Sequence, residues 1–375
     1  MRIAVLADFG STFTKVSLVE LGTGRLVGHA SAPTSANSDV MNGYRSAVNE
    51  ALRMSDADVS IEARLAASSA GGGLRAASVG LVEELTSAAA RQAALNAGAR
   101  VELVLSGRLC DQDARSLELA DPDIVLFSGG TDDGQERMVL ENAEVVAHAR
   151  IDAHFVVACN AGISRQVAQR LSVDGRRVDV VDNVLPEISR LNVAPAREAI
   201  GHAFLEHVIA GKGLSETNEF TRSVVMPTPE AVLTATELLA AGTGDVRGWG
   251  EVVVIDVGGA TTDVHSAASS TRSTPGVNQP LLPILPVLRT VQGDLGLRSN
   301  AGSVIEQDRE WILAALGPGY DVERAVLERT RDPAFLPADD DWAMDRALAT
   351  SCLTYALQRH CGRLSIRVRP NQAVR

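Results

Sequence analysis

Two stretches of the sequence carry the same order of residue types: an aspartate after an apolar run, then glycine, hydroxyl side chains and a second charged residue. They are D-F-G-S-T-F-T-K, from Asp8 to Lys15, and D-V-G-G-A-T-T-D, from Asp256 to Asp263. Glycine lets the backbone turn sharply, so that N–H groups and hydroxyls can face the oxygen atoms of a phosphate group. Each stretch therefore predicts a phosphate-binding turn between two strands.

The charged residues of both motifs suit the same chemistry. Asp8 and Asp256 each end an apolar run, where a carboxylate can hold hydrated Mg²⁺ together with phosphate oxygens. Lys15 would balance the phosphate charge. One such motif alone is better explained as an ordinary glycine turn, but two copies favour phosphate binding. The residues expected to contact phosphate are Gly10, Ser11, Thr12, Thr14, Lys15, Gly258, Gly259, Thr261 and Thr262.

Apolar strands are predicted beside both motifs. Residues 2–7 and 16–21 flank the first, and residues 251–257 precede the second. Two further extended stretches, residues 65–69 and 78–82, are separated by three glycines. We expect those glycines to form a tight turn between the two strands.

Helices alternate with short strands between about residues 85 and 185, which predicts βαβ units and a parallel sheet. Several of these strands run into polar or glycine-rich corners, and the carboxyl ends of strands are where open α/β sheets bind ligands. This module could therefore bind a ligand. The helices are predicted at 86–96, 111–119, 136–149 and 164–171, and the strands at 101–105, 124–127, 155–158 and 178–181.

Length and composition narrow the class of protein. A chain of 375 residues is longer than a single hydrophobic core usually supports, so we expect two domains, at residues 1–250 and 251–375. The net charge of −12 argues against nucleic-acid binding. The apolar runs are too short to cross a bilayer, and no secretory leader is recognisable, so we expect a soluble cytoplasmic protein.

Other reactive side chains give no sign of a second site. The four cysteines are scattered with no C-x-x-C pair, which favours reduced core thiols over a metal site. His265 follows the second motif and could orient a water, but a structural histidine at a strand end explains it better.

The motifs resemble those of a known superfamily. D-F-G-S-T-F-T-K and V-I-D-V-G-G-A-T-T-D-V are similar to the phosphate 1 and phosphate 2 motifs of the actin, Hsp70 and sugar-kinase ATPases. The blocks L-F-S-G-G-T-D-D-G, V-V-D-N-V-L-P-E-I and R-T-V-Q-G-D-L-G-L-R are similar to the glutamate mutase accessory proteins called MutL or GlmL. The resemblance implies a two-domain actin-like (ribonuclease H-like) α/β fold that binds Mg-ATP between its domains, with an additional βαβ module in the first half.

The same resemblance implies a function. MutL-type proteins are chaperone-like ATPases thought to reactivate an adenosylcobalamin-dependent mutase by helping a damaged cobalamin to leave. It further implies that Asp8 and Asp256 hold Mg²⁺ while Lys15 and the hydroxyls bind ATP, and we expect Asp263 to orient the attacking water. We expect the charged loop at residues 131–137 of the βαβ module to select the partner mutase. The alternatives are a small-molecule kinase of the same superfamily and a partner-binding protein that has lost ATPase activity.

Two departures from the family pattern bear on nucleotide binding. Ala260 stands where the superfamily has a third glycine. After Gly259 no Gly-Gly pair occurs, although the family normally continues into a glycine turn that packs on adenosine. We therefore expect a shortened second domain and weak nucleotide binding that depends mainly on the triphosphate.

Overall fold

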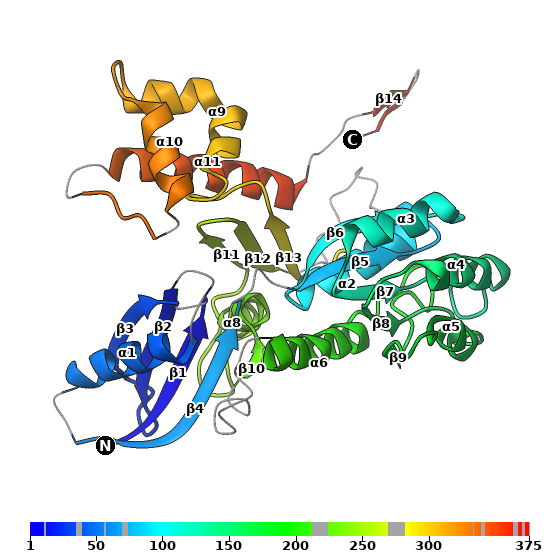
Figure 1. The fold of residues 1–375 in the computed structure, drawn as a ribbon, viewed down its shortest axis with the longest axis horizontal. Coiled ribbons are helices and arrows are strands. Elements are labelled where there is room, and N and C mark those ends of the chain that lie inside the picture. The colour runs from blue at the N-terminus through cyan, green and yellow to red at the C-terminus, as the bar shows by residue number, and fades with distance from the viewer. Residues whose placement is uncertain are drawn as a thin grey trace. The chain divides into compact units, whose positions relative to one another are not determined.

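A computed structural model of the chain describes residues 1–10, 13–34, 40–55, 58–69, 74–211, 224–268, 282–332, 334–338, 342–362, 367–369 and 372–374. The chain divides into two compact units. Unit 1 is Met1–Val232 with Pro280–Ile284, and unit 2 is Leu233–Gln279 with Leu285–Arg375. Both contain helices and strands, as Figure 1 shows. Among the described residues, no helix combines the length and apolar character needed to span a membrane.

The first sheet of unit 1 carries the first motif. Its strand order is β10-β4-β1-β2-β3, with β1, β2 and β3 antiparallel and with β4 and β10 parallel to β1. Helix α1 packs on β2 and β3 through buried side chains that include Tyr44, whose ring lies 5.8 Å from that of Phe9. The bounds are β1 Arg2–Phe9, β2 Phe13–Glu20, β3 Leu26–Pro33, α1 Val40–Arg53, β4 Ser60–Ser68 and β10 Val224–Pro227.

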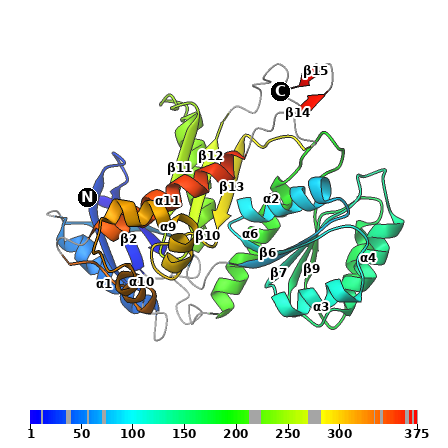
Figure 2. The ribbon, with the colours of Figure 1, turned by 90° about the horizontal axis from the view of Figure 1, so that it is seen from above.

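The second sheet of unit 1 is entirely parallel and is inserted between β4 and β10. Its order is β6-β5-β7-β8-β9, a doubly wound arrangement. Buried residues of α2 and α6 pack on one face and those of α3, α4 and α5 on the other, and Figure 2 shows this layering. The bounds are β5 Arg75–Val79, η1 Glu83–Ser87, α2 Ala88–Asn96, β6 Arg100–Leu105, α3 Asp111–Ala120, β7 Ile124–Phe127, α4 Arg137–His148, β8 His154–Val157, α5 Ser164–Leu171, β9 Val178–Val180 and α6 Ala194–Gly211.

This sheet corrects one prediction. The stretches expected to pair across a glycine turn, in β4 and β5, belong to different sheets. Gly71, Gly72 and Gly73 lie outside the described residues. Strand β5 begins the parallel sheet, which extends the βαβ module beyond its expected start near residue 85.

Unit 2 contains an antiparallel sheet of order β11-β12-β13 beneath three helices. Apolar residues of α9, α10 and α11 form its core, with Val264 of β12 at the centre of the sheet face. A separate two-stranded sheet joins β14 to β15. The bounds are α8 Thr228–Ala241, β11 Val252–Val257, β12 Thr262–Ala267, β13 Val287–Gln292, α9 Ala301–Leu316, α10 Val322–Arg331, α11 Trp342–Cys361, β14 Arg367–Arg369 and β15 Gln372–Val374.

The fold confirms the expected α/β class with parallel strands and an additional βαβ module. The prediction that all four cysteines are core thiols is wrong. Cys159 and Cys352 are buried, but Cys110 and Cys361 are exposed. Burial raises the pKa of the Cys159 thiol to about 12, so this thiol stays protonated.

Candidate functional site

The first motif forms the turn between β1 and β2. Asp8 and Lys15 are direct cross-strand partners. Their side chains face each other, with the Lys15 Nζ 3.6 Å from the Asp8 Oδ2. The Asp8 Oδ1 accepts a hydrogen bond of 2.7 Å from the hydroxyl of Thr228. The turn therefore presents a carboxylate that is held from two sides and remains partly exposed.

Thr228 was not predicted as a site residue. It is the first residue of α8, directly after β10, and β1, β4 and β10 run parallel to the same edge of the sheet. The positive end of the α8 dipole therefore lies at this edge, where it favours negative charge. A Thr-Pro-Glu helix start was visible in the sequence, but its pairing with Asp8 was not.

The two motifs share one backbone hydrogen bond across the turn. In the first, the Gly10 N–H donates to the Phe13 carbonyl at 3.1 Å, and in the second the Gly258 N–H donates to the Thr261 carbonyl at 2.8 Å. A Cβ on Gly10 would lie 2.5 Å from the Phe13 oxygen, which explains the glycine. The repeated residue order in the sequence therefore corresponds to a repeated structure.

Two of the predicted phosphate-binding hydroxyls are used inside the protein. Thr14 is fully buried and shares a 3.0 Å hydrogen bond with Thr34, which donates to the Gly10 carbonyl. Thr262 is also fully buried and donates to the Leu295 carbonyl at 2.9 Å. These hydroxyls fix the turns from within. Ser11 and Thr12 lie outside the described residues.

The charges of the second motif are arranged differently. Asp256 and Asp263 are direct cross-strand partners on β11 and β12. Asp263 is nearly buried and pairs with Arg289 of β13, whose Nε donates to it at 2.7 Å. The hydroxyl of Thr261 donates to its other oxygen at 3.3 Å. Asp256 is exposed, so the two aspartates have different surroundings.

His265 lies beside this ion pair. It is 1% exposed, and its cross-strand partner on β13 is Arg289. Burial, and next the charge of Arg289, lower the pKa of His265 to about 4. Its Nδ1 has no hydrogen-bond partner among the described residues. The ring is therefore neutral near pH 7.

A second loop, residues 293–300, supports the turn of the second motif. The backbone N–H groups of Leu297 and Arg298 donate to the carbonyls of Gly258 and Gly259 at 3.0 and 2.7 Å. Asn300 Nδ2 donates to the Ala260 carbonyl at 2.6 Å. Three consecutive carbonyls of the turn are thus held by one loop. The block R-T-V-Q-G-D-L-G-L-R pointed to this region, but its contact with the turn was not predicted.

The side chain of Arg298 connects this loop to helix α11. It forms a bidentate ion pair with Asp345 of α11, at 3.2 and 2.9 Å. Asp345 also accepts a 2.6 Å bond from Arg329, which is fully buried and lies over the Phe335 ring. These three charged side chains link the turn to α10 and α11.

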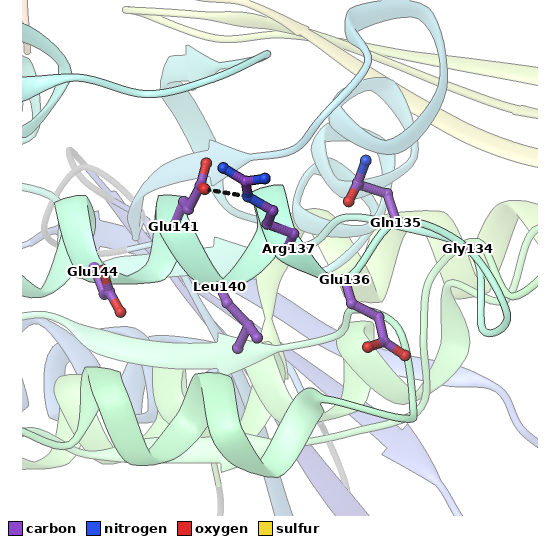
Figure 3. Close-up of a pocket in the computed structure, with 7 residues that line it drawn as sticks. All are labelled: Gly134, Gln135, Glu136, Arg137, Leu140, Glu141 and Glu144. Carbon is purple, nitrogen blue, oxygen red and sulfur yellow. Dashed lines mark hydrogen bonds and ion pairs between the residues drawn. The ribbon is translucent and has the colours of Figure 1, made fainter.

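The predicted partner loop borders an open pocket of about 690 Å³ at the start of α4, shown in Figure 3. Arg137 donates to Glu141 at 2.8 Å, while Glu136 points away from this pair. Arg108 also donates to Glu141, and these two hydrogen bonds lower the pKa of its carboxyl. The pocket is lined by Gly134, Gln135, Glu136, Arg137, Leu140, Glu141 and Glu144.

The donor set fits Mg²⁺ bound through phosphate better than a metal held by protein alone. No group of three or more metal-binding side chains occurs in the part of the chain that the structure describes. Each turn instead offers one accessible carboxylate, Asp8 or Asp256. Mg²⁺ commonly takes one or two carboxylates and completes its shell with water and phosphate oxygens.

Comparisons with known proteins establish the family of this chain. The family model described as "MutL protein" matches residues 4–374. "Protein MutL" of Clostridium tetanomorphum is 37% identical over 366 residues, covering 96% of this chain and 79% of the relative.

Solved structures are more distant. A nucleotide-free acetone carboxylase is 15% identical with a TM-score of 0.34 and covers 79% of this chain, which spans about half of that chain's length (48%). The xylulose kinase of Bifidobacterium adolescentis is 15% identical with a TM-score of 0.28, covering 96% of this chain and 81% of its own. These scores are too low to carry an argument, whereas the family match spans nearly the whole sequence. The chain belongs to the MutL protein family.

Proposed function

We propose that the protein is a chaperone-like ATPase that assists or reactivates an adenosylcobalamin-dependent mutase of the glutamate mutase type. The observation that carries the ATPase part is the repeated turn, in which Asp8 and Asp256 each stand two residues before the glycine that closes it. Membership of the MutL family supports the accessory role.

In this proposal each turn binds the phosphates of Mg-ATP. Asp8 and Asp256 would hold Mg²⁺, which stabilises the negative charge that develops on the phosphates. Thr228 fixes the Asp8 carboxylate through its 2.7 Å bond. The Lys15 Nζ lies 3.6 Å from Asp8, beyond hydrogen-bond distance, so it can turn to a phosphate oxygen at little cost.

The hydroxyls and Asp263 have the remaining roles, which are phosphate binding and orientation of the attacking water. Because Thr14 and Thr262 are buried and bonded within the turns, backbone N–H groups and the hydroxyls of Ser11, Thr12 and Thr261 contact phosphate. Asp263, which is paired with Arg289, orients the attacking water by accepting a hydrogen bond. Catalysis then depends on positioning and electrostatics.

The test is ATP turnover with and without a purified mutase carrying inactivated cobalamin. We expect the mutase to stimulate turnover and to recover activity only when ATP is present. Turnover stimulated by small acids or sugars, with a phosphorylated product, would establish a kinase instead. Mutase binding without any turnover would establish a partner-binding protein that has lost ATPase activity.

A further inference from the structure

The inserted parallel sheet has a second candidate site at its carboxyl edge. An open pocket of about 780 Å³ lies where β7, β8 and β9 end, within the usual size of small-molecule sites. It is remote in sequence from both phosphate-binding turns. Its lining is mostly polar and consists of Asp132, Ala161, Gly162, Ser164, Arg165, Val180, Val181, Asp182, Asn183, Pro186, Arg190, Leu191 and Asn192.

The pocket differs in place from the usual ligand position of such a sheet. In this strand order a ligand normally binds between the first and third strands, here β5 and β7. Ser128, which follows β7, is buried, and its hydroxyl donates to the carbonyls of Val79 and Thr86 at 2.7 and 3.1 Å. The open pocket lies instead at the ends of β8 and β9, the neighbouring strands.

The walls of the pocket are fixed by hydrogen bonds between three loops. Asp132 Oδ1 accepts from the Ala161 N–H at 3.1 Å and from Asn183 Nδ2 at 2.9 Å. Asn183 also donates to the Gly130 carbonyl, and the Asp132 N–H donates to the Pro186 carbonyl. The loops after β7, β8 and β9 are therefore tied together through Asp132 without a ligand.

One side of the pocket is suited to an anion. Helix α5 begins there at Ser164, and no side chain caps its first N–H groups. Arg165 is exposed and makes no ion pair within the described ranges. Directly behind the wall, Asn160 is fully buried, and its Oδ1 accepts the Gly162 N–H at 2.9 Å. Its Nδ2 has no partner among the described residues, but Asn160 is not part of the pocket lining.

The other side is acidic. Asp182 follows β9, the strand adjacent to β8, and it is exposed in the pocket lining. In doubly wound nucleotide-binding folds the phosphate lies at the helix N-terminus after one strand. An acidic residue after a nearby strand then binds the ribose hydroxyls. Ser164 with Arg165 and Asp182 stand in this relationship.

We propose that this pocket binds a ribose phosphate compound of the nucleotide class, with its phosphate at the start of α5 and its ribose hydroxyls at Asp182. The site is separate from the two phosphate-binding turns and does not depend on the function proposed for them. Arg190, held 3.3 Å from Glu187, adds a second cation to the lining.

The experiment is calorimetric titration of the whole chain with ribose 5-phosphate and, separately, with inorganic phosphate. We expect saturable binding of ribose 5-phosphate that is at least about tenfold tighter than that of phosphate alone. Arg165→Gln and Asp182→Asn should each weaken it about tenfold or more. Both side chains are exposed, so the fold should tolerate their replacement.

Two control variants test whether ribose 5-phosphate binds at this pocket and not elsewhere on the chain. Asp133→Asn changes an exposed aspartate that is absent from the pocket lining, and it should bind like the unmodified protein. Asp8→Asn should also leave ribose 5-phosphate binding unchanged, which separates this site from the proposed ATP site. The proposal is overturned by no binding up to about 10 mM, by equal affinity for phosphate and ribose 5-phosphate, or by variants at Arg165 and Asp182 that bind normally.

Discussion

Asp263 occupies in the β11–β12 hairpin the position that Lys15 occupies in the β1–β2 hairpin, since each is the direct cross-strand partner of the aspartate before the turn. The charges are opposite. Lys15 compensates Asp8 within its own hairpin, whereas Asp263 relies on Arg289 from the third strand. The two motifs therefore share a hydrogen bond across the turn but present different side-chain chemistry.

The first prediction concerns the carboxylates before the turns. Asp8→Ala or Asp256→Ala should lower Mg-dependent ATP turnover at least about a hundredfold, because each removes a carboxylate proposed to hold Mg²⁺. Each carboxylate is at least partly exposed, so the free energy of unfolding should fall by no more than about 0.5–3 kcal/mol. Turnover by malachite green assay and urea unfolding measure the two effects. Asp152→Ala, at another exposed aspartate, is the control, and normal turnover in both test variants would reject the phosphate-site assignment.

The second prediction concerns the buried pair of Asp263 and Arg289. Their side chains are 12% and 3% exposed, so removing either partner leaves a desolvated charge or donor. Asp263→Asn and Arg289→Gln should each lower the free energy of unfolding by about 3–5 kcal/mol. The double variant should lose clearly less than the sum of the two. The exposed pair of Arg309 and Glu323 provides the comparison, where a loss within about 1 kcal/mol is expected. Additive losses at Asp263 and Arg289 would contradict their coupling.

The third prediction is a pH dependence that arises from His265. The folded protein holds its pKa near 4, whereas an unfolded chain has a histidine pKa near 6.5. As the pH falls from about 6.5 to 4 the unfolded state binds the proton first, so stability is lost over this range, by about 2–3 kcal/mol. Urea unfolding at pH 7.5, 5.5 and 4.5 should show a smaller decline in His265→Gln. The control is His29→Gln, at an exposed histidine of β3, which should show the same decline as the unmodified protein.

The sequence predicted local elements well and long-range pairings poorly. The helix expected at residues 164–171 is α5, Ser164–Leu171, because its apolar spacing and its ends are local signals. Strand β10 was missed, since Val224–Pro227 is only four residues in a polar passage and becomes a strand by pairing with β4. That pairing also places Thr228 beside Asp8, a contact that no local pattern encodes.

The repeated turn is the part of the site that sequence could identify. Gly10 and Gly258 lie where a Cβ would approach a carbonyl oxygen to 2.5 and 3.0 Å, so a glycine recurs at this position in both motifs. The hydroxyl contacts could not be predicted in this way. Successive side chains of a strand point to opposite faces of the sheet, and Thr14 and Thr262 point to the buried face. Residue type alone therefore could not distinguish the hydroxyls that are bonded within the turns from those available to a phosphate group.

The fourth prediction tests the loop that supports the second turn. Asn300 Nδ2 donates to the carbonyls of Ala260 and Gly293 at 2.6 and 2.7 Å. Asn300→Ala removes both bonds, so the affinity for ATP should fall about five- to thirtyfold, equivalent to about 1–2 kcal/mol. The shift in melting temperature with added ATP reports this affinity. The neighbouring exposed Ser299→Ala should leave the shift unchanged. A variant that unfolds more easily but keeps the full affinity would mean that the loop stabilises only the fold.

The last prediction concerns the loop at residues 131–137 as the surface that selects the mutase. Asp132 is unsuitable for mutation, because its carboxylate ties the loops after β8 and β9. Asp133 and Glu136 are exposed, and Glu136 points away from the Arg137–Glu141 pair. Asp133→Lys with Glu136→Lys reverses the charge of the loop without breaking its internal bonds. We expect this double variant to bind the mutase at least about tenfold more weakly, because like charges placed at an interface repel the original partner.

The matched control is Asp152→Lys with Glu198→Lys, which makes the same change in net charge at two exposed acidic residues elsewhere in unit 1. It should bind the mutase normally, so that a loss in the loop variant cannot be ascribed to net charge alone. Basal ATP turnover should be equal in both double variants, since neither changes a residue of the phosphate-binding turns. Surface-immobilised mutase titrated with each variant measures the affinity. Undiminished binding by the loop variant would remove this loop from the interface and direct the search to the other exposed faces of the chain.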